Sequence, residues 1–251
     1  MHDPRIVPRE EWIVARREHL ANEKALTRAL DELRAERRRL PWVRIDKDYV
    51  FEGAEGRIGL AGLFAGRSRL FVQHFMFSPD RDEGCVGCSF HADHVDAAWR
   101  HLAQRDMAFA AVSRAPFAKL DAYRRRMGWR FRWVSSFGSD FNHDFGVSFT
   151  PVRIAAGEAI HNYAPARHVM EEEHGVSVFI RREDGIFHTY SAYARGVEPL
   201  LGAYAWLDMM PDGRDEAPAG NLTAWVRRHD SYGPQPAAPE CCCDTPRQAA
   251  E

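Results

Sequence analysis

The first forty residues show the hydrophobic spacing of a helix. Residues 9–39 contain neither Gly nor Pro, and Leu26, Leu30 and Leu33 recur at positions i, i+4 and i+7. This pattern predicts one long amphipathic helix. Acidic residues are interleaved with its arginines, which favours a solvated helix face, or a homodimer contact through the apolar stripe, over a nucleic-acid interface.

After Pro41, short strand patterns alternate with helix patterns. Strand-like apolar runs lie at 43–45, 49–51, 69–77, 109–112 and 133–135. Apolar residues recur with helical spacing at 89–104, and a second helix is predicted at 116–127. The second helix begins with a Pro, which suits the first helical position. The order of strand, helix, strand and helix predicts a βαβ unit with a parallel sheet.

A β-hairpin pattern begins the last part of the chain. Two apolar runs, at 176–180 and 186–191, flank a segment that contains Asp-Gly, a common hairpin turn. Residues 199–209 then predict a closing helix, and the composition of the chain end predicts disorder from about residue 231. We therefore expect an N-terminal helical extension (1–40), a main domain (41–210) and a C-terminal extension (211–251).

Composition and charge restrict the class of protein. The 251 residues fit one enlarged domain, and the hydrophobic share of 45% is enough for an ordinary core. A formal net charge of -2 gives no general attraction to nucleic acid. No apolar run approaches the roughly 20 residues that span a bilayer, and the first residues are charged where a signal peptide is apolar. We expect a cytoplasmic protein with no nucleic-acid or membrane partner.

Cys85 and Cys88 form a CxxC motif between the predicted strand at 69–77 and the predicted helix at 89–104. A cysteine at the start of a helix lies near unpaired backbone N–H groups, whose partial positive charge stabilises the thiolate. Cys85, the outer residue, is therefore the expected nucleophile. Cys88, one helical turn later, is the thiol expected to resolve a mixed disulfide.

A metal site is the alternative interpretation of the same motif. Cys85, Cys88, His91 and His94 recur every third residue, and thiolate and imidazole are ligands of zinc and copper. On a helix each step of three residues falls short of a full turn by about 60°, so His94 points away from Cys85. The remaining ligand set is Cys85 and Cys88 with His91 or His143. Outside a metal site, His91 and His94 are expected to face solvent.

Four phenylalanines recur at every fourth position in an aromatic and acidic segment. Phe137, Phe141, Phe145 and Phe149 are interrupted by Gly, Ser, Asp and Asn residues, which favour a loop that returns to a strand over a helix. The phenylalanines are expected to contribute to the core.

Polar residues of this segment are candidates for a supporting role. Asp140, His143 and Asp144 can form an acid-base or ligand cluster, or can cap turns through local hydrogen bonds. Arg114, which follows a predicted strand, can stabilise a thiolate, bind an anionic substrate, or pair with a carboxylate.

The order of elements is that of a thioredoxin fold, and five local sequences resemble a bacterial thioredoxin-like family catalogued as domain of unknown function 899. These sequences are LPWV at 40–43, CVGCSF at 85–90, VSRAP at 112–116, GWRFRWVSSFGSDFNHDFGVSF at 128–149 and FHTYSAYARG at 187–196. The resemblance implies an α/β thioredoxin-like fold, with a central mixed sheet flanked by helices and a long N-terminal helical extension.

The sequence departs from better-known relatives at two points. Thioredoxins place a cis-proline before the strand that faces the dithiol, where this chain has Gly175-Val176-Ser177. Peroxiredoxins place Thr or Ser three residues before the reactive cysteine, where this chain has Asp82. Neither general thioredoxin activity nor peroxidase activity therefore follows from the resemblance.

Three hypotheses follow. The first is a thiol-disulfide oxidoreductase without a cofactor that acts on a thiol or disulfide substrate, either a protein or a small molecule. It uses Cys85 and Cys88, with Arg114, His143 and Asp140 as candidate supporting residues. The second is a non-catalytic protein that binds copper or zinc through the same cysteines and a histidine. The third is a thioredoxin fold that mediates only association through its N-terminal helix. The three tail cysteines, 241–243, are accessory in each case.

Overall fold

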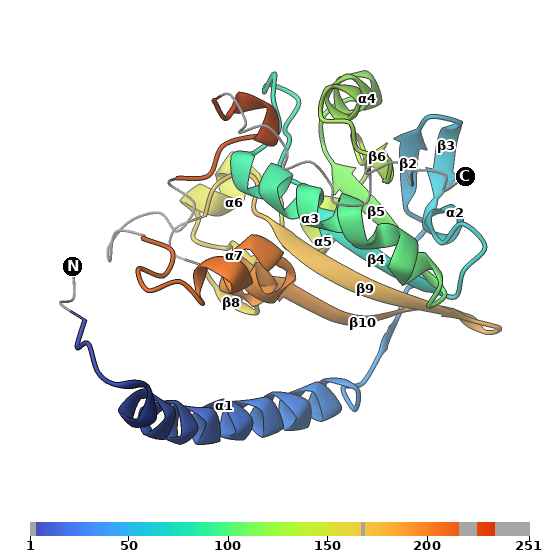
Figure 1. Cartoon of the computed structure of the whole chain (residues 1–251). Helices are drawn as coiled ribbons and strands as arrows, with labels where there is room; N and C mark the ends of the chain where they lie inside the picture. Colours follow the sequence, from blue (N-terminus) through green and yellow to red (C-terminus); the bar gives the residue numbers. More distant parts are fainter. Residues whose placement is uncertain (1–3, 167–168, 216–224, 234–251) are drawn as a thin grey trace, which may run out of the picture.

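The centre of the molecule is a mixed eight-stranded sheet (Figure 1). The structure is a computed structural model that describes residues 4–166, 169–215 and 225–233. The strands of this sheet are β1 (Val43–Arg44), β2 (Val50–Gly53), β3 (Gly56–Gly59), β4 (Arg69–His74), β5 (Met107–Ser113), β6 (Arg132–Ser135), β9 (Gly175–Arg182) and β10 (Gly185–Tyr193). A separate pair is formed by β7 (Ile160–His161) and β8 (Ala164–Pro165).

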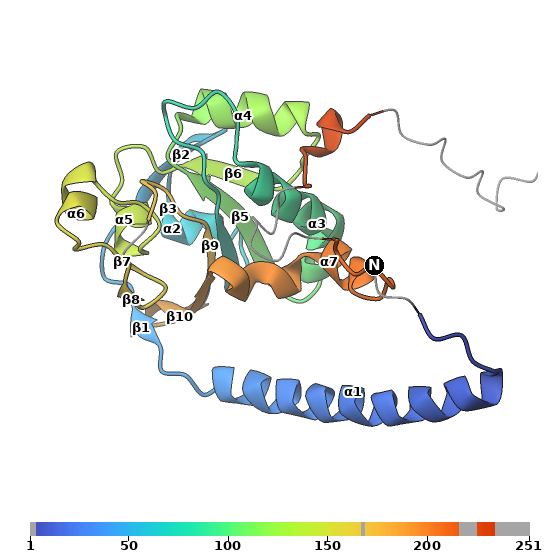
Figure 2. The same cartoon turned by 90° about the vertical axis from the view of Figure 1, so that its left-hand side faces the viewer.

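Helices connect and flank these strands. The α-helices are α1 (Arg9–Arg37), α2 (Leu60–Leu63), α3 (Val86–Ala103), α4 (Phe117–Arg126), α5 (Phe141–Asp144), α6 (Pro151–Ala155) and α7 (Gly202–Leu207). Two 3-10 helices are η1 (Ala194–Leu200) and η2 (His229–Ser231). Figures 1 and 2 show α3 and α4 on the same side of the central strands, as two successive right-handed crossovers require.

The strand order is β1-β10-β9-β4-β5-β6-β2-β3. β4, β5 and β6 are parallel, and β9 pairs antiparallel with β4 on one side and with β10 on the other. The β4-α3-β5 unit with the antiparallel β9–β10 hairpin beside its first strand is the thioredoxin-like arrangement, and β6 extends the sheet beyond β5. The predicted α/β thioredoxin-like class, with its mixed sheet and N-terminal helix, is confirmed.

The alternation of side chains along the parallel strands divides the core into two layers. On β4, Leu70 and Val72 pack with Phe51, Phe64 and the other residues of one cluster. The next residues along the chain, beginning at Phe75, pack with Cys88, Leu120, Tyr123 and Trp133 beneath α3 and α4. Because successive side chains of a strand point to opposite faces, the dithiol helix rests on one layer while the second layer supports the strands from behind.

Two predicted elements differ from those observed. The apolar run at 69–77 stays buried to its end, but β4 ends at His74 and the chain leaves the sheet after Phe75. The closing helix predicted at 199–209 is divided into η1 and α7. The interruption lies at Leu201, whose φ of -96° and ψ of 84° are not helical.

α1 lies along one side of the domain with no buried residue (Figures 1 and 2). Leu26, Leu30 and Leu33, the residues of the predicted apolar stripe, are exposed. One contact with the sheet is made by Arg37, whose guanidinium lies 4.4 Å from the centre of the Tyr190 ring. The predicted helix is confirmed, whereas its homodimer contact stays a prediction. Among the described residues, no helix is both long and apolar enough to cross a membrane.

The four spaced phenylalanines have different environments. Phe141, Phe145 and Phe149 are buried as predicted, but Phe137 is 62% exposed. The chain turns sharply after Phe137 at Gly138, which has a φ of +77°, and then forms α5 in place of the expected loop. The prediction of a core position was wrong for Phe137, because the turn directs this residue away from the sheet.

Part of the C-terminal extension is packed on the domain. Val226 is buried against Phe90, Leu201 and Tyr204, and η2 lies beyond it. Most of the segment predicted to be disordered, from residue 234 onward, lies outside the described residues.

The contrast between Phe141 and Phe137 gives a test of the core. Phe141→Ala is expected to lower the free energy of unfolding by about 3–5 kcal/mol, because it leaves a large cavity among aromatic rings. Phe137→Ala, the matched control, is expected to change it by less than about 0.5 kcal/mol. Urea denaturation measures both, and equal losses would contradict the placement of these side chains.

Candidate active site

Cys85 lies immediately before α3, at the end of the loop that follows β4. It is the residue that precedes α3, and its carbonyl oxygen accepts the first helical hydrogen bond, from the Ser89 backbone N–H at 2.9 Å. Its own N–H donates to the Met76 carbonyl at 3.1 Å. The preceding residue must be small, because a Cβ atom on Gly84 would lie 2.6 Å from a ring carbon of Phe75. This close approach sets the position at which α3 begins.

The two thiols have different surroundings and different acidities. Both are free; Cys85 is partly accessible and Cys88 is buried. A hydrogen bond from the Cys88 thiol lowers the pKa of Cys85 to about 6, and the N–H groups of Gly87 and Cys88 and the charge of Arg228 act in the same direction against the effect of burial. The same hydrogen bond and complete burial raise the pKa of Cys88 well above its usual range. Near neutral pH, Cys85 is therefore the thiolate and Cys88 the thiol.

Arg228 connects the C-terminal segment to the start of α3. Its guanidinium donates to the Gly84 carbonyl at 2.7 Å and to the Tyr123 hydroxyl at 2.8 Å, and it forms an ion pair with Glu83 at 2.9 Å. The Tyr123 hydroxyl in turn lies 2.9 Å from the hydroxyl of Ser89 in the first turn of α3. Arg228 thus places a positive charge next to the dithiol and compensates the charge of Glu83.

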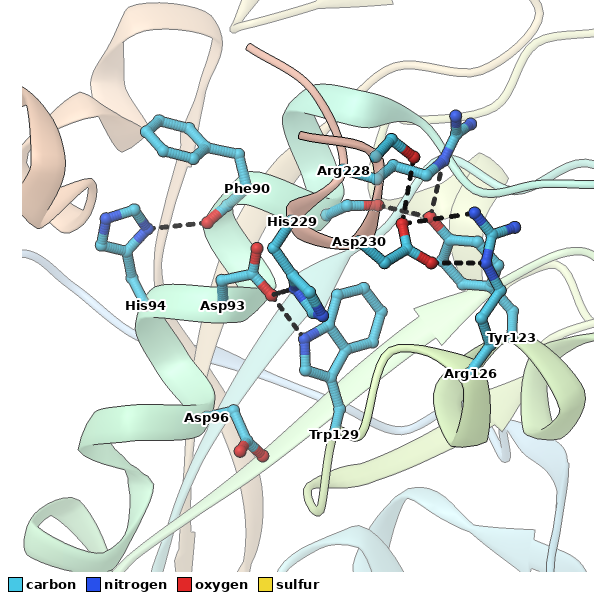
Figure 3. A network of polar contacts seen from close by, with 12 residues as sticks. Phe90, Asp93, His94, Asp96, Tyr123, Arg126, Trp129, Arg228, His229 and Asp230 are labelled. Atoms are coloured by element: carbon cyan, nitrogen blue, oxygen red, sulfur yellow. Dashed lines mark hydrogen bonds and ion pairs between the residues drawn. The ribbon is translucent and has the colours of Figure 1, made fainter. Parts of the chain in front are cut away.

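Further polar contacts hold this segment in place (Figure 3). Arg126 of α4 donates to Asp230 at 2.7 Å and also binds Glu83. Asp93 of α3 accepts hydrogen bonds from the Trp129 indole and the His229 ring, each at 2.7 Å. Residues 225–233 therefore bridge α3 and α4 at the end of the sheet where the thiols lie. No local pattern indicated this role, because Arg228 is 144 positions away from Gly84 along the chain.

A cavity of about 400 Å³ opens beside the dithiol. Cys85 and Cys88 both line it, together with residues from β4, from the segment before β9 and from η1 and α7. His91 also lines it and is only 5% exposed, so the expectation that this histidine faces solvent was wrong. Burial lowers the pKa of His91 to about 3, and the ring is uncharged at neutral pH. α7 and η1 cover this part of α3, which the helix pattern alone could not indicate.

His94 lies on another face of α3. Its Nδ1 atom is 2.7 Å from the Phe90 carbonyl, and its Nε2 atom accepts a hydrogen bond from the Ala203 backbone at 2.9 Å. His94 is half-buried under α7 and is not solvent-facing as expected. It does not line the cavity that contains the thiols.

The acidic cluster of the aromatic segment lies elsewhere. Lys47 donates to Asp140 at 2.8 Å and to Asp144 at 2.7 Å, and the His143 ring lies 2.9 Å from the Ser148 carbonyl. None of these residues lines the cavity of the dithiol. Of the candidate metal ligands, Cys85, Cys88 and His91 share the cavity and His143 does not. In the ranges that the structure describes, no three His, Cys, Asp or Glu side chains are grouped to hold a metal ion.

Glu172 is a buried carboxyl group that the sequence did not single out. It is 8% exposed, and its Oε1 atom has no hydrogen-bond partner. Burial raises the pKa of Glu172 to about 7, although the charge of Arg114 partly opposes this effect. When ionised, Glu172 contributes to the raised pKa of Cys88. Arg114 therefore acts near the dithiol through Glu172 and is not itself part of the cavity lining.

Comparison with known proteins identifies a family and several structural neighbours. The model of a family described as bacterial protein of unknown function (DUF899) matches residues 1–232. No curated protein matches the chain.

The solved structures that are similar include three peroxiredoxins. PrxQ from Xylella fastidiosa is 13% identical, with a TM-score of 0.42 over 66% of this chain and 94% of that chain. Peroxidoxin BcpB from Mycobacterium tuberculosis is 12% identical, with a TM-score of 0.41 over 65% of this chain and 94% of that chain. Peroxiredoxin Q from Xanthomonas campestris is 12% identical, with a TM-score of 0.43 over 65% and 95% of the two chains.

The burial of Glu172 predicts a pH-dependent stability. The ordinary pKa of a Glu carboxyl is 4.5, and that of Glu172 in the folded protein is about 7. Between these two pH values the folded protein binds more protons at Glu172 than the unfolded chain does. The contribution of Glu172 to the free energy of unfolding therefore falls as the pH rises through this window. At about 1.4 kcal/mol per pKa unit, the loss is about 3 kcal/mol by pH 8. Glu172→Gln is expected to remove it, so the variant gains stability relative to the natural protein between pH 4 and pH 8.

Urea denaturation at several pH values measures this difference. Glu183→Gln, at an exposed position in the turn between β9 and β10, serves as the control and is expected to show no such trend. A Glu172→Gln variant whose relative stability does not change with pH would contradict the raised pKa.

The acidity of Cys85 predicts its alkylation profile. The rate of modification by iodoacetamide is expected to rise with a midpoint near pH 6 and to level off by about pH 8, because only the thiolate reacts. Mass spectrometry of the Cys85 peptide follows this reaction separately from that of the other cysteines. In urea the midpoint is expected to return to about 8.5; the same midpoint in the folded and unfolded protein would contradict the effect of the fold.

Proposed function

The chain belongs to the bacterial DUF899 family, and we propose that it is a thiol-disulfide oxidoreductase in which Cys85 is the nucleophile and Cys88 the resolving thiol. The geometry of the two thiols is the observation that carries this proposal: Cys85 is partly accessible at the start of α3, whereas Cys88 is buried one helical turn later. The opposite directions of the two pKa shifts support the same division of roles. An exchange reaction requires one thiolate that attacks the substrate disulfide and a second thiol that later attacks the mixed disulfide.

The first step is attack of the Cys85 thiolate on one sulfur of a substrate disulfide. A bond forms between the Cys85 sulfur and that substrate sulfur, the substrate S–S bond breaks, and the other half leaves as a thiolate. The N–H groups at the start of α3 and the charge of Arg228 stabilise the attacking thiolate before the reaction.

The second step is attack of the Cys88 sulfur on Cys85. The Cys88 thiol gives up its proton, the Cys85–Cys88 disulfide forms, and the bound half of the substrate leaves and takes up a proton. When Cys85 enters the mixed disulfide, it no longer carries the negative charge that disfavours ionisation of Cys88. The pKa of Cys88 therefore falls at the stage when its thiolate is needed. The substrate has gained two electrons, and an external dithiol restores the protein.

The proposal gives Asp140 and His143 no catalytic role. Their contacts are with Lys47 and Ser148, and neither residue lines the cavity of the thiols. Arg114 is proposed to act as a positioning residue, because its charge opposes the raised pKa of Glu172.

Cysteine substitutions test the two assigned roles. Cys85→Ser is expected to lower disulfide reduction with dithiothreitol as electron donor by about 100-fold or more, because the attacking thiolate is lost. Cys88→Ser is expected to accumulate a mixed disulfide on Cys85, which mass spectrometry detects. A variant with all three tail cysteines, 241–243, changed to Ser is the control and should retain activity. Activity retained by Cys85→Ser would refute the proposal.

A further inference from the structure

We propose that the cavity beside Cys85 and Cys88 binds a small, uncharged disulfide whose arms carry hydrogen-bonding groups. This inference rests on the proposed function and specifies its substrate class: a low-molecular-weight compound and not a protein disulfide. Three features carry it, namely the position of the cavity, the unsatisfied polar atoms of its lining side chains and a lining whose described cationic side chain is paired with a carboxylate.

The cavity has the position and size of a substrate site. Its volume of about 400 Å³ is within the usual range for small-molecule pockets, which is about 300–1,000 Å³. Both thiols lie in its wall, so a ligand inside it meets the dithiol directly. Met170 also lines the cavity and is 59% exposed, which places the entrance beside this residue.

Two side chains of the lining each have one buried polar atom without a hydrogen-bond partner. They are Gln73, through its Oε1 atom, and His91, through its Nε2 atom, and the two residues are 1% and 5% exposed. The other end of Gln73 is occupied, since its Nε2 donates to the Cys88 carbonyl at 3.0 Å. The ring of His74 packs instead on Phe141 and Phe145, in the layer on the other side of the sheet.

The fold therefore holds Gln73 in position while its Oε1 atom has no partner. A buried polar atom without a partner costs about 1–3 kcal/mol. Among the described residues, seven side-chain atoms are buried in this way, and those of Gln73 and His91 belong to side chains of this lining. Hydroxyl or amide groups on a ligand can supply the missing partners.

The electrostatics of the cavity favour an uncharged ligand. Burial holds the pKa values of His74 and His91 near 3, so both rings are neutral at physiological pH. Arg195 and Glu198 also line the cavity, but they bind each other at 2.9 Å and 3.2 Å. An anionic ligand would lose its hydration and would meet the negative charge of the Cys85 thiolate.

The rest of the lining is apolar and suits short aliphatic arms. Met76, Val197 and Leu201 contribute thioether and aliphatic surface. A disulfide with one arm in the cavity would present a sulfur atom to Cys85. The Cys85 thiolate would then break the ligand S–S bond and Cys88 would release the bound half, so that one disulfide and one dithiol become two substrate thiols and the Cys85–Cys88 disulfide.

A binding experiment tests the site without requiring any reaction. The full-length protein with all five cysteines changed to Ser cannot exchange disulfides. Titration of this protein with bis(2-hydroxyethyl) disulfide is expected to show saturable binding that shifts the NMR signals of the His91 ring. Glutathione disulfide, which carries several charges, is expected to bind at least about tenfold more weakly. No saturable binding of the neutral probe, or equal binding of both probes, would overturn the inference.

A kinetic experiment with matched variants tests the substrate class in the active protein. His91→Phe removes one free polar atom and reduces the space in the cavity. It is expected to raise the KM for bis(2-hydroxyethyl) disulfide about tenfold, and to affect the reduction of the insulin disulfides much less. His101→Phe, on the exposed side of the same helix, is the control. An unchanged KM, or an equal loss on both substrates, would overturn the inference.

A second variant tests the same site if His91→Phe does not fold. Met170→Trp changes an exposed residue at the entrance and is expected to raise the KM for the same neutral disulfide.

The binding and kinetic experiments also separate the inference from the proposed function. Binding of the neutral probe by a protein that reduces no disulfide would refute the proposed reaction and retain the site. Reduction of insulin in preference to the small disulfide would retain the reaction and refute the site.

Discussion

The close approach of Gly84 to the ring of Phe75 is the constraint on which the arrangement of the thiols depends. There is no room for a side chain at this position, so the loop that follows β4 can pass closely over Phe75 before it enters α3. Cys85 then lies at the helix start, where its sulfur meets backbone N–H groups, and Cys88 is buried one turn below. The difference in acidity between two identical side chains therefore originates in their positions: Cys85 lies near the N–H groups at the helix start, and Cys88 is buried.

The surroundings of the dithiol combine stabilising and destabilising groups. The layer beneath α3 and α4 is rich in aromatic side chains, and the polar contacts of Arg228, Arg126 and Asp93 hold the C-terminal segment against it. By contrast, Glu172 and the polar atoms around the cavity are buried without all of their partners. Such groups reduce stability, and they are concentrated around the thiols, where binding and pKa control can make use of them.

Much of the fold was predictable because local patterns report it. The long helix α1, the parallel strands and the β9–β10 hairpin follow from the periodicity of apolar residues and from turn residues within each segment. Predictions from the sequence were wrong where segments that are distant in the sequence determine the environment of a residue. His91 was expected to face solvent because the helix pattern contains no information about η1 and α7, which cover it. Phe137 was expected in the core because its spacing matches that of Phe141, but a single glycine turn separates their environments.

The same division between local patterns and distant contacts applies to the candidate site. The sequence by itself determined that a CxxC motif stands at the start of a helix, since both the motif and the helix are local. Only the tertiary structure decided what surrounds it. Arg228 comes from the far end of the chain, Glu172 from the segment before β9, and the cavity from the meeting of β4, α3, η1 and α7. The physical reason is that burial and charge act through space, whereas sequence patterns report only neighbours along the chain.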